Sequence, residues 1–341
     1  MKAGHNPSRI FPDIAAQILE RIESARRPLL LSHVRLDGDA LGAELALAHI
    51  LKARGLKPHV VNDSPIPQIY KFLPGAGEVA TSTAELRSDY DLAIALDLPS
   101  WSRADALRKA LPRNLPIVSI DHHPPIERIG DLDWVDTGKS SVGEMIYLLA
   151  VAGRWVISPE AATCLYVAIL TDTGRFTFPN TTAKALHAAA DLVQLGAQHI
   201  LAAEKIYQET SLSLLALRTE ALQNLRLHAG GKIAVMRVTE DMMTRAGVDP
   251  IDTQEMPDYP RSISGVVVGI LLREMQGSGK VKVSLRSRHG VDIEPIARKL
   301  GGGGHHEAAG YETVGGMEAV EKKVVGEITQ LLQQSSVVFR K

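Results

Sequence analysis

The chain of 341 residues is poor in cysteine, in aromatic residues and in long apolar runs. Its one cysteine, Cys164, excludes an internal disulfide and every zinc site that takes two thiolates from the same chain. No stretch approaches the roughly 20 apolar residues that span a bilayer, and the N-terminal segment lacks an apolar core of signal-peptide length. We therefore expect a cytoplasmic protein in a reducing compartment, with no membrane as a partner.

The chain also lacks an excess of charge of one sign. It has 38 lysines and arginines against 39 aspartates and glutamates, for a formal net charge of −1 at pH 7. A near-neutral chain has no global attraction to polyanions, so a long footprint on duplex nucleic acid is not expected. A nucleic-acid substrate would be short and would need a local cationic site.

The length and the 45% apolar content predict two domains rather than one core. We expect them over 1–210 and 230–341, with a helical linker over 211–229. In the first, strands that are apolar throughout, such as 91–97 and 116–121, alternate with helices, which is typical of an α/β domain with a parallel sheet covered on both faces. The second is predicted as a smaller mixed α/β domain that ends in a helix over 317–333.

Parallel sheets of this kind bind ligands beyond the carboxyl ends of their strands, and polar residues follow several of these ends. The first group is His33, Asp37 and Asp39, which a tight turn at Gly38 would bring together on adjacent cations. Taken alone, aspartates in a strand-to-helix loop are more often helix caps or turn residues.

A second group is Asp121-His122-His123, directly after a buried strand, where one imidazole is expected to ligate a metal while the other faces substrate. Asp97 also ends a strand, although a lone aspartate there is usually a turn residue. Asp172 ends a helix, where a carboxylate opposes the helix dipole unless a cation neutralises it.

Together, four segments deliver mixed carboxylate and imidazole ligands to strand or helix ends of one predicted sheet, which makes coincidence the poorer account. This donor set without thiolate suits Mn²⁺, or alternatively Mg²⁺, and two such metals are the usual device for phosphate-ester hydrolysis. The six predicted ligands are His33, Asp37, Asp39, Asp97, His122 and Asp172.

The glycine-rich segment 301–310 is the candidate substrate site of the second domain. We expect its backbone N–H groups, including those of Gly303 and Gly304, and a following short helix to bind an anion beside His305 or His306. The alternative is a flexible linker. Arg286 is a candidate phosphate ligand, or else an exposed strand arginine, and Ser140 is a candidate phosphate contact, or else part of a helix cap.

These motifs, with the triplet at 121–123 and the glycine-rich segment, resemble the DHH phosphoesterase superfamily over nearly the whole chain. Segments 72–75, 171–176 and 258–262 are similar to its group of bifunctional oligoribonucleases and 3′-phosphoadenosine-5′-phosphate (pAp) phosphatases. One departure is Val34-Arg35-Leu36, where relatives often carry Asn-Pro before the aspartate.

We expect a homodimer as one assembly state. The resemblance implies a Mn²⁺-dependent, two-metal hydrolase of short single-stranded RNA, dinucleotides and pAp. It implies that His123 faces the scissile phosphate, that Asp121 orients its neighbours, and that Arg286, His305 and His306 hold the far end of the nucleotide. It places His33, Asp37 and Asp97 around one cation and Asp39, Asp97, His122 and Asp172 around the other.

Two other functions stay open at this point. The same metals without base recognition would hydrolyse inorganic pyrophosphate or polyphosphate. A nucleotide-binding module with a decayed metal site is the non-enzymatic alternative, although all the expected ligands are present.

Overall fold

The computed structural model describes residues 12–253 and 256–334. The chain divides into two compact units, Met1–Glu209 and Thr210–Lys341. Helix α8 (Leu212–Gln223), inside the predicted linker, packs on α9 (Glu240–Ala246) and β7 (Ile233–Val238) of the second unit. Among the described helices, none is long and apolar enough to cross a membrane.

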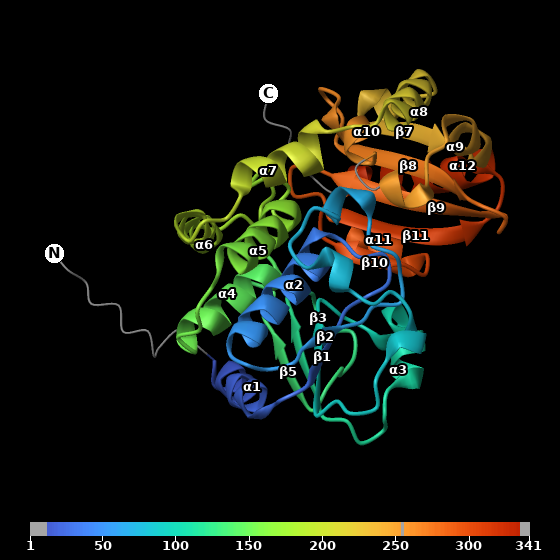
Figure 1. The fold of residues 1–341 in the computed structure, drawn as a ribbon. Coiled ribbons are helices and arrows are strands. Elements are labelled where there is room, and N and C mark those ends of the chain that lie inside the picture. Colours follow the sequence, from blue (N-terminus) through green and yellow to red (C-terminus); the bar gives the residue numbers. More distant parts are fainter. Residues whose placement is uncertain (1–11, 254–255, 335–341) are drawn as a thin grey trace. The chain divides into compact units, whose positions relative to one another are not determined.

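The first unit is built on a five-stranded sheet in which every described neighbouring pair is parallel, as the sequence predicts (Figure 1). Three of its strands are completely buried, which is why their sequences are apolar throughout. In sheet order the strands are β2 (His59–Val60), β1 (Pro28–Leu31), β3 (Leu92–Leu96), β4 (Ile117–Asp121) and β5 (Leu132–Val135).

The sequence reading missed β5, which lies at the edge of this sheet. Its four residues include an aspartate and are only partly buried. The Asp133 side chain accepts hydrogen bonds from the backbone N–H groups of Ile129 and Gly130, so it serves the preceding turn. A short, half-exposed strand of this composition gives neither an apolar run nor a clear alternation.

Apolar clusters cover both faces of the sheet. One face packs against α2 (Gly38–Ala53), α4 (Val142–Ala152) and α5 (Pro159–Asp172), which lie together in Figure 1. The other face packs against α3 (Asp105–Ala110). The remaining helices of the unit are α1 (Asp13–Ser24), α6 (Ala183–Gln194) and α7 (His199–Ala203), which continues into a π-helical turn (Glu204–Gln208).

Glycines allow α2, α4 and α5 to approach closely. A Cβ on Gly42 would lie 2.6 Å from the Cys164 carbonyl oxygen, and one on Gly143 would lie 2.4 Å from the Ala168 Cβ. Gly38 was expected to sharpen a turn. It is instead the first residue of α2, and it is needed for space, since a Cβ there would lie 2.4 Å from Thr171 Oγ1.

The second unit is built on a six-stranded mixed sheet, in which β7 and β8 are parallel and the other described pairs are antiparallel. In sheet order its strands are β10 (Gly303–His305), β11 (Ala308–Val314), β9 (Lys280–Ser287), β8 (Val268–Met275), β7 (Ile233–Val238) and β6 (Arg226–His228).

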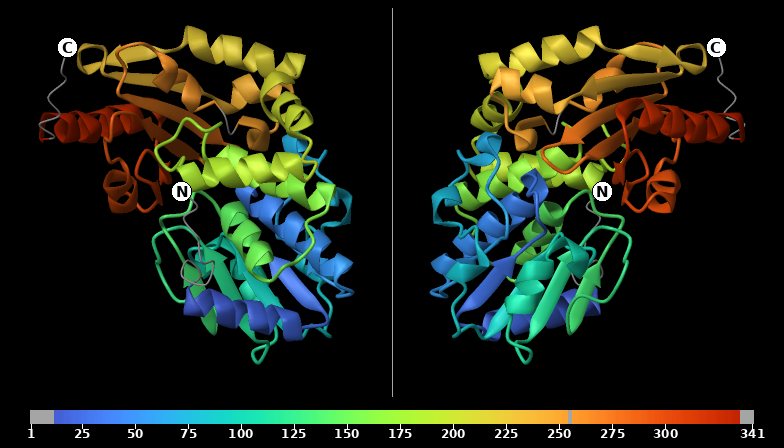
Figure 2. Two further views of the ribbon diagram at one scale, coloured as in Figure 1. Left: turned by 90° about the vertical axis from the view of Figure 1, so that its left-hand side faces the viewer. Right: turned by 90° about the vertical axis from the view of Figure 1, so that its right-hand side faces the viewer.

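Helices cover both faces of this sheet as well (Figure 2). Helix α12 (Met317–Gln334), predicted from the sequence, packs with α11 (Glu294–Lys299) on one face. On the other face lie α8, α9 and α10 (Asp258–Ser262).

In the glycine-rich segment 301–310 the expectation of a following short helix is wrong. The chain continues directly into strand β11. Gly303, Gly304 and His305 form β10, which pairs with β11 in a hairpin. A Cβ on Gly304 would lie 2.4 Å from the Ala308 carbonyl oxygen, so close strand pairing explains that glycine. A glycine run before a small-residue turn is compatible both with the start of a helix and with a tight hairpin, and the pairing register shows the hairpin.

Candidate metal centre and active site

The carboxyl ends of β1, β3 and β4 deliver His33, Asp97 and the 121–123 triplet to one edge of the parallel sheet. The three strands are neighbours, and parallel strands end at the same edge, so side chains far apart in sequence meet there. Asp97 has a φ of 54°, in the left-handed region that aspartate tolerates better than most residues. The backbone thus turns sharply at the point where β3 ends.

Asp97 lies between the two groups of predicted ligands. Its Oδ2 is 3.2 Å from His33 Nε2, and its Oδ1 is 3.7 Å from His122 Nε2. The two groups are each compact, because the ligand atoms within them lie within 4.8 Å of one another. They are His33, Asp37 and Asp97 on one side, and Asp39, His122 and Asp172 on the other.

Two helices supply the carboxylates of the second group. Asp39 is in the first turn of α2, and Asp172 is the last residue of α5. His122 Nε2 is 3.6 Å from Asp39 Oδ2 and 3.5 Å from Asp172 Oδ2. The close approach of α2, α4 and α5 therefore sets the spacing of this group.

The start of α4 fixes the Asp39 carboxylate. Its two oxygens accept hydrogen bonds from the backbone N–H groups of Val142 (2.7 Å) and Gly143 (2.9 Å). A helix N-terminus favours a negative charge, so α4 both orients and stabilises this carboxylate. Ser141 caps the same helix by accepting a hydrogen bond from the Glu144 N–H.

Asp37 has one of the two roles that the sequence left as alternatives, the helix cap, and its position leaves the other open. Its Oδ1 caps α2 by accepting from the N–H groups of Asp39 and Ala40. Its Oδ2 lies 3.7 Å from His33 Nε2. The side chain is 45% exposed, so one oxygen serves the helix while the other faces the site.

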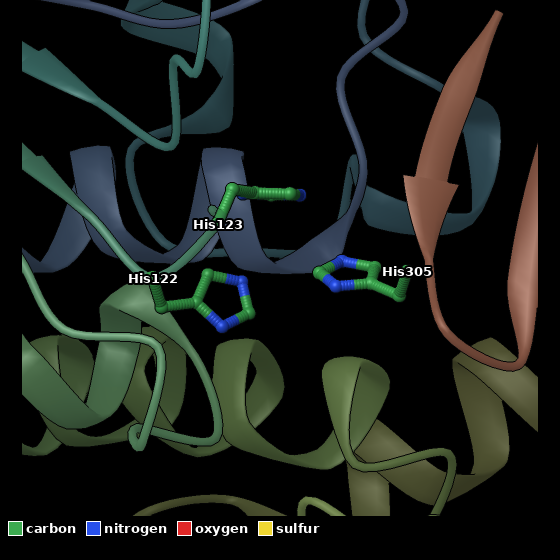
Figure 3. A group of neighbouring side chains, drawn as sticks. All are labelled: His122, His123 and His305. Carbon is green, nitrogen blue, oxygen red and sulfur yellow. The ribbon is translucent and has the colours of Figure 1, made fainter. Parts of the chain in front are cut away.

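His122 and His123 lie side by side after β4, with ring centroids 4.7 Å apart and planes at 67° (Figure 3). His123 Nδ1 is 2.8 Å from Asp121 Oδ1 and 3.2 Å from Asp97 Oδ1. Asp121 also accepts from the His123 backbone N–H at 2.9 Å. Asp121 therefore holds the orientation of His123, the relationship that the sequence predicted for it.

Backbone carbonyls orient the other two imidazoles. His33 Nδ1 is 2.8 Å from the Val34 carbonyl, and His122 Nδ1 is 3.3 Å from the Lys139 carbonyl. Donation from Nδ1 to a carbonyl places the proton there and leaves Nε2 as the ligating nitrogen. In both residues Nε2 is the atom that faces the carboxylates.

The protein itself balances only part of the charge of the site. Burial would raise the pKa of Asp97, but His123 and His33 hold it well below its usual range. Burial raises the pKa of Asp39 well above its usual range, and the neighbouring Asp97 and Asp172 carboxylates add to the rise. Burial also raises the pKa of Asp172 to about 6. Burial alone would lower the pKa of His33, but the Asp37 and Asp97 carboxylates outweigh it and raise the pKa to about 9.

The residues present fit a pair of divalent cations. In the described part of the chain, no lysine or arginine forms an ion pair with Asp37, Asp39, Asp97 or Asp172. Asp97 Oδ1 is buried and accepts no hydrogen bond of good geometry there. Oxygen and imidazole donors without thiolate suit hard or borderline cations such as Mn²⁺ and Mg²⁺.

In the second unit, the strand register aligns Arg286 with His305. On β11, Ala308 pairs with His305 of β10 on one side and with Arg286 of β9 on the other. Directly paired residues share a sheet face, so the small Ala308 leaves room between the two larger side chains. His306 lies in the hairpin turn and is exposed, with Nε2 4.0 Å from Asp292 Oδ2.

Arg286 has neighbours that the sequence reading did not connect with it. Asp258 Oδ1 lies 2.9 Å from Arg261 and 3.8 Å from Arg286 Nε. Burial lowers the pKa of Arg286, and the Arg261 charge adds to this effect while Asp258 opposes it. The packing of α10 on the sheet brings these residues together, and no spacing in the sequence signals it.

Ser140 is buried, and its hydroxyl donates to Glu144 Oε2 at 2.8 Å. Its backbone N–H donates to the same oxygen. The side chain therefore supports the first turn of α4, which is the capping interpretation of this residue.

Comparisons with known proteins agree with this geometry. Residues 29–169 match the model of the DHH family, N-terminal domain, and residues 230–334 match the DHHA1 domain. A Thermus thermophilus relative, named bifunctional oligoribonuclease and PAP phosphatase NrnA, is 35% identical over 300 residues, which are 87% of this chain and 86% of the relative. The chain belongs to the DHH family. It is a phosphoesterase, as the sequence resemblance implied.

A second relative of this DHH phosphoesterase carries the same name, and a solved structure has the same fold. A Bacillus subtilis protein of the same name is 34% identical over 286 residues, covering 83% of this chain and 88% of the relative. The crystal structure of an exopolyphosphatase-related protein from Bacteroides fragilis matches with a TM-score of 0.85 at 24% identity, covering 98% of this chain and 100% of that one. The structural match confirms the α/β fold class.

Proposed function

We propose that this DHH phosphoesterase hydrolyses short oligoribonucleotides to mononucleotides and pAp to AMP, with two Mn²⁺ ions as cofactors. The observation that carries the proposal is the position of Asp97, with one carboxylate oxygen beside each compact ligand group. Relatives at 34–35% identity carry the names of oligoribonuclease and PAP phosphatase, which supports the choice of substrate.

The proposed metal ligands are the six side chains predicted from the sequence, with Asp97 shared between the two groups. When bound, the cations would neutralise charge on the phosphoryl oxygens and activate the attacking water. The ring nitrogens His33 Nε2 and His122 Nε2 face the carboxylates and are the donors we assign.

His123 is the residue that we assign to the scissile phosphate. Asp121 and Asp97 both face its Nδ1, which fixes the ring, and the opposite nitrogen is the proposed phosphate contact. A fixed ring places a hydrogen-bond donor where phosphoryl charge develops, without reorganisation during the reaction.

Arg286, His305 and His306 are the proposed contacts for the remainder of the nucleotide. The row formed by His305, Ala308 and Arg286 supports this assignment, because a guanidinium and an imidazole on one sheet face suit a phosphate next to a ribose or base. Gly303 and Gly304, in the same hairpin, are the proposed backbone N–H contacts for the nucleotide.

A turnover panel with the purified protein in Mn²⁺ tests the proposal. We expect hydrolysis of pAp and of a dinucleotide, and slower hydrolysis of longer RNA. Turnover of pyrophosphate alone would overturn the proposal in favour of the inorganic substrate. Turnover of none of these would favour a decayed binding module. Cell fractionation tests the predicted cytoplasmic compartment, and light scattering after size-exclusion chromatography tests the predicted homodimer.

A further inference from the structure

Three polar groups lie buried in a row behind His33. The backbone N–H of Ser32 donates to Asn62 Oδ1 at 3.0 Å, and Asn62 Nδ2 donates to Glu44 Oε2 at 2.8 Å. All three residues have no exposed surface. The row therefore joins the end of β1 to the interior of α2 without water.

The local backbone explains why a side chain makes the first of these bonds. Strand β2 ends at Val60, and the chain then leaves the sheet, with the Asn62 N–H bonded to the Ala80 carbonyl. The Asn62 side-chain carbonyl takes the place of a strand carbonyl opposite Ser32. Because one end of the amide accepts and the other donates, the two partners also fix its orientation.

Stability does not explain Glu44. Its second oxygen, Oε1, is buried and accepts no hydrogen bond among the described residues. Burial raises the pKa of this carboxyl to about 8. An unpartnered buried polar atom lowers stability, and an apolar residue would suit the surrounding core better.

The row acts on a metal ligand through the backbone. His33 directly follows Ser32, and on its other side the Val34 N–H donates to the Arg103 carbonyl at 2.8 Å. The segment that carries His33 is thus held at both ends. A shift of Ser32 would move His33 Nε2 away from Asp97, which lies 3.2 Å from it.

We propose that Glu44 and Asn62 are positioning residues, which hold the end of β1 so that His33 keeps the place a divalent cation requires. The inference rests on the proposed metal-dependent function. It goes beyond that function because neither residue belongs to the six assigned ligands or contacts the substrate.

The test measures Mn²⁺ binding to the purified full chain by the electron paramagnetic resonance signal of free Mn²⁺, with no substrate present. Asn62→Leu removes the acceptor for the Ser32 N–H at similar volume, and Glu44→Met removes the acceptor for Asn62. In each variant we expect one of the two Mn²⁺ equivalents to weaken about tenfold, as is usual when outer partners of metal ligands are lost. The other equivalent, which lacks His33, should keep its affinity.

Two further variants separate positioning from a general loss of stability. Glu44→Gln keeps an acceptor for Asn62 and should restore Mn²⁺ affinity to within about twofold of wild type. Leu47→Ala, one turn along α2 and fully buried, should lower the melting temperature without changing Mn²⁺ affinity.

Coupling gives a second readout. Because both substitutions break the same row, the variant carrying Asn62→Leu and Glu44→Met should lose no more Mn²⁺ affinity than Asn62→Leu alone. The Mn²⁺ concentration for half-maximal turnover of pAp should rise by the same factor, while the KM for pAp stays constant.

Several outcomes would overturn the inference. Unchanged Mn²⁺ affinity in both Asn62→Leu and Glu44→Met would show that the row is only structural, while the proposed function would stand. Equal weakening in Leu47→Ala would also overturn it. Reduced Mn²⁺ affinity in a protein that hydrolyses no phosphoester would support the row and reject the proposed function instead.

Discussion

In the first unit most of the predicted site residues follow the ends of parallel strands, whereas in the second they lie on the face of a mixed sheet and in a hairpin. Parallel topology forces His33, Asp97 and His122 to one edge whatever the exact register. In the second unit, only the register of three strands puts His305 in a row with Arg286. Sites at strand ends are therefore readable from sequence, and sites on sheet faces are not.

The largest expected effect is loss of turnover in Asp97→Asn, a change compatible with the left-handed backbone there. Even outer partners of metal ligands cost about 10–100-fold, so a shared ligand should cost more than about 100-fold in kcat/KM for pAp and for a dinucleotide. Asp91→Asn, at the other end of β3, is the matched control, because Asp91 only caps the Arg26 and Arg27 N–H groups. Retained turnover in Asp97→Asn would remove the basis for a shared ligand.

Mn²⁺ should stabilise the two units unequally. At free Mn²⁺ of 100 times its Kd, binding to the folded state adds about 2.7 kcal/mol of stability. Hydrogen exchange should show added protection within 29–172 and none within 230–334. Equal protection in both segments would contradict a metal site confined to the first unit.

Replacing glycine with alanine should change the free energy of unfolding in opposite directions at one position in each unit. Gly42→Ala places a methyl group against the Cys164 carbonyl and should cost about 1–3 kcal/mol of stability, with a loss of Mn²⁺ affinity. Gly326→Ala, on α12 with no atom within 4 Å of the added Cβ, should stabilise by about 0.5–1 kcal/mol. Chemical denaturation measures the stability change of each variant. A Gly42→Ala variant more stable than wild type would show that close approach of α2 and α5 does not require this glycine.

The smallest expected effect is a change in KM without a change in kcat, in a variant of the second unit. Arg286→Ala should raise the KM for pAp about tenfold, because a hydrogen bond to a charged group contributes about 1.5–3 kcal/mol, and it should leave kcat nearly constant. Arg298→Ala, which breaks only an exposed pair with Glu294 on α11, should change neither constant. A collapse of kcat with constant KM would place Arg286 in the transition state and not in the binding of the nucleotide.

Fully buried strands are among those that the sequence predicted correctly. β1, β3 and β4 are apolar throughout because both faces of their sheet are covered, and this run is visible without an alignment. The short edge strands β5 and β6 were missed because partial burial leaves no such pattern. Helix α7 continues into a π-helical turn, a detail that apolar spacing does not encode.

The partners that orient the site were also outside the reach of sequence reasoning. The α4 amides that hold Asp39 are about a hundred positions away from it. Glu44 had one signal, an acid in the middle of a mostly apolar helix, but its partner Asn62 gave none. The Asp258 and Arg261 neighbours of Arg286 likewise meet only through the sheet.

The sequence by itself determined which residues end the parallel strands, and hence the carboxylate and imidazole donors of the candidate centre, because strand ends in such a sheet meet regardless of loop detail. Tertiary structure decided everything that depends on register and close approach between distant segments: the alignment of Arg286 with His305 across β11, and the packing of α2 against α5. These arise from contacts between backbones distant in sequence, which local composition does not encode.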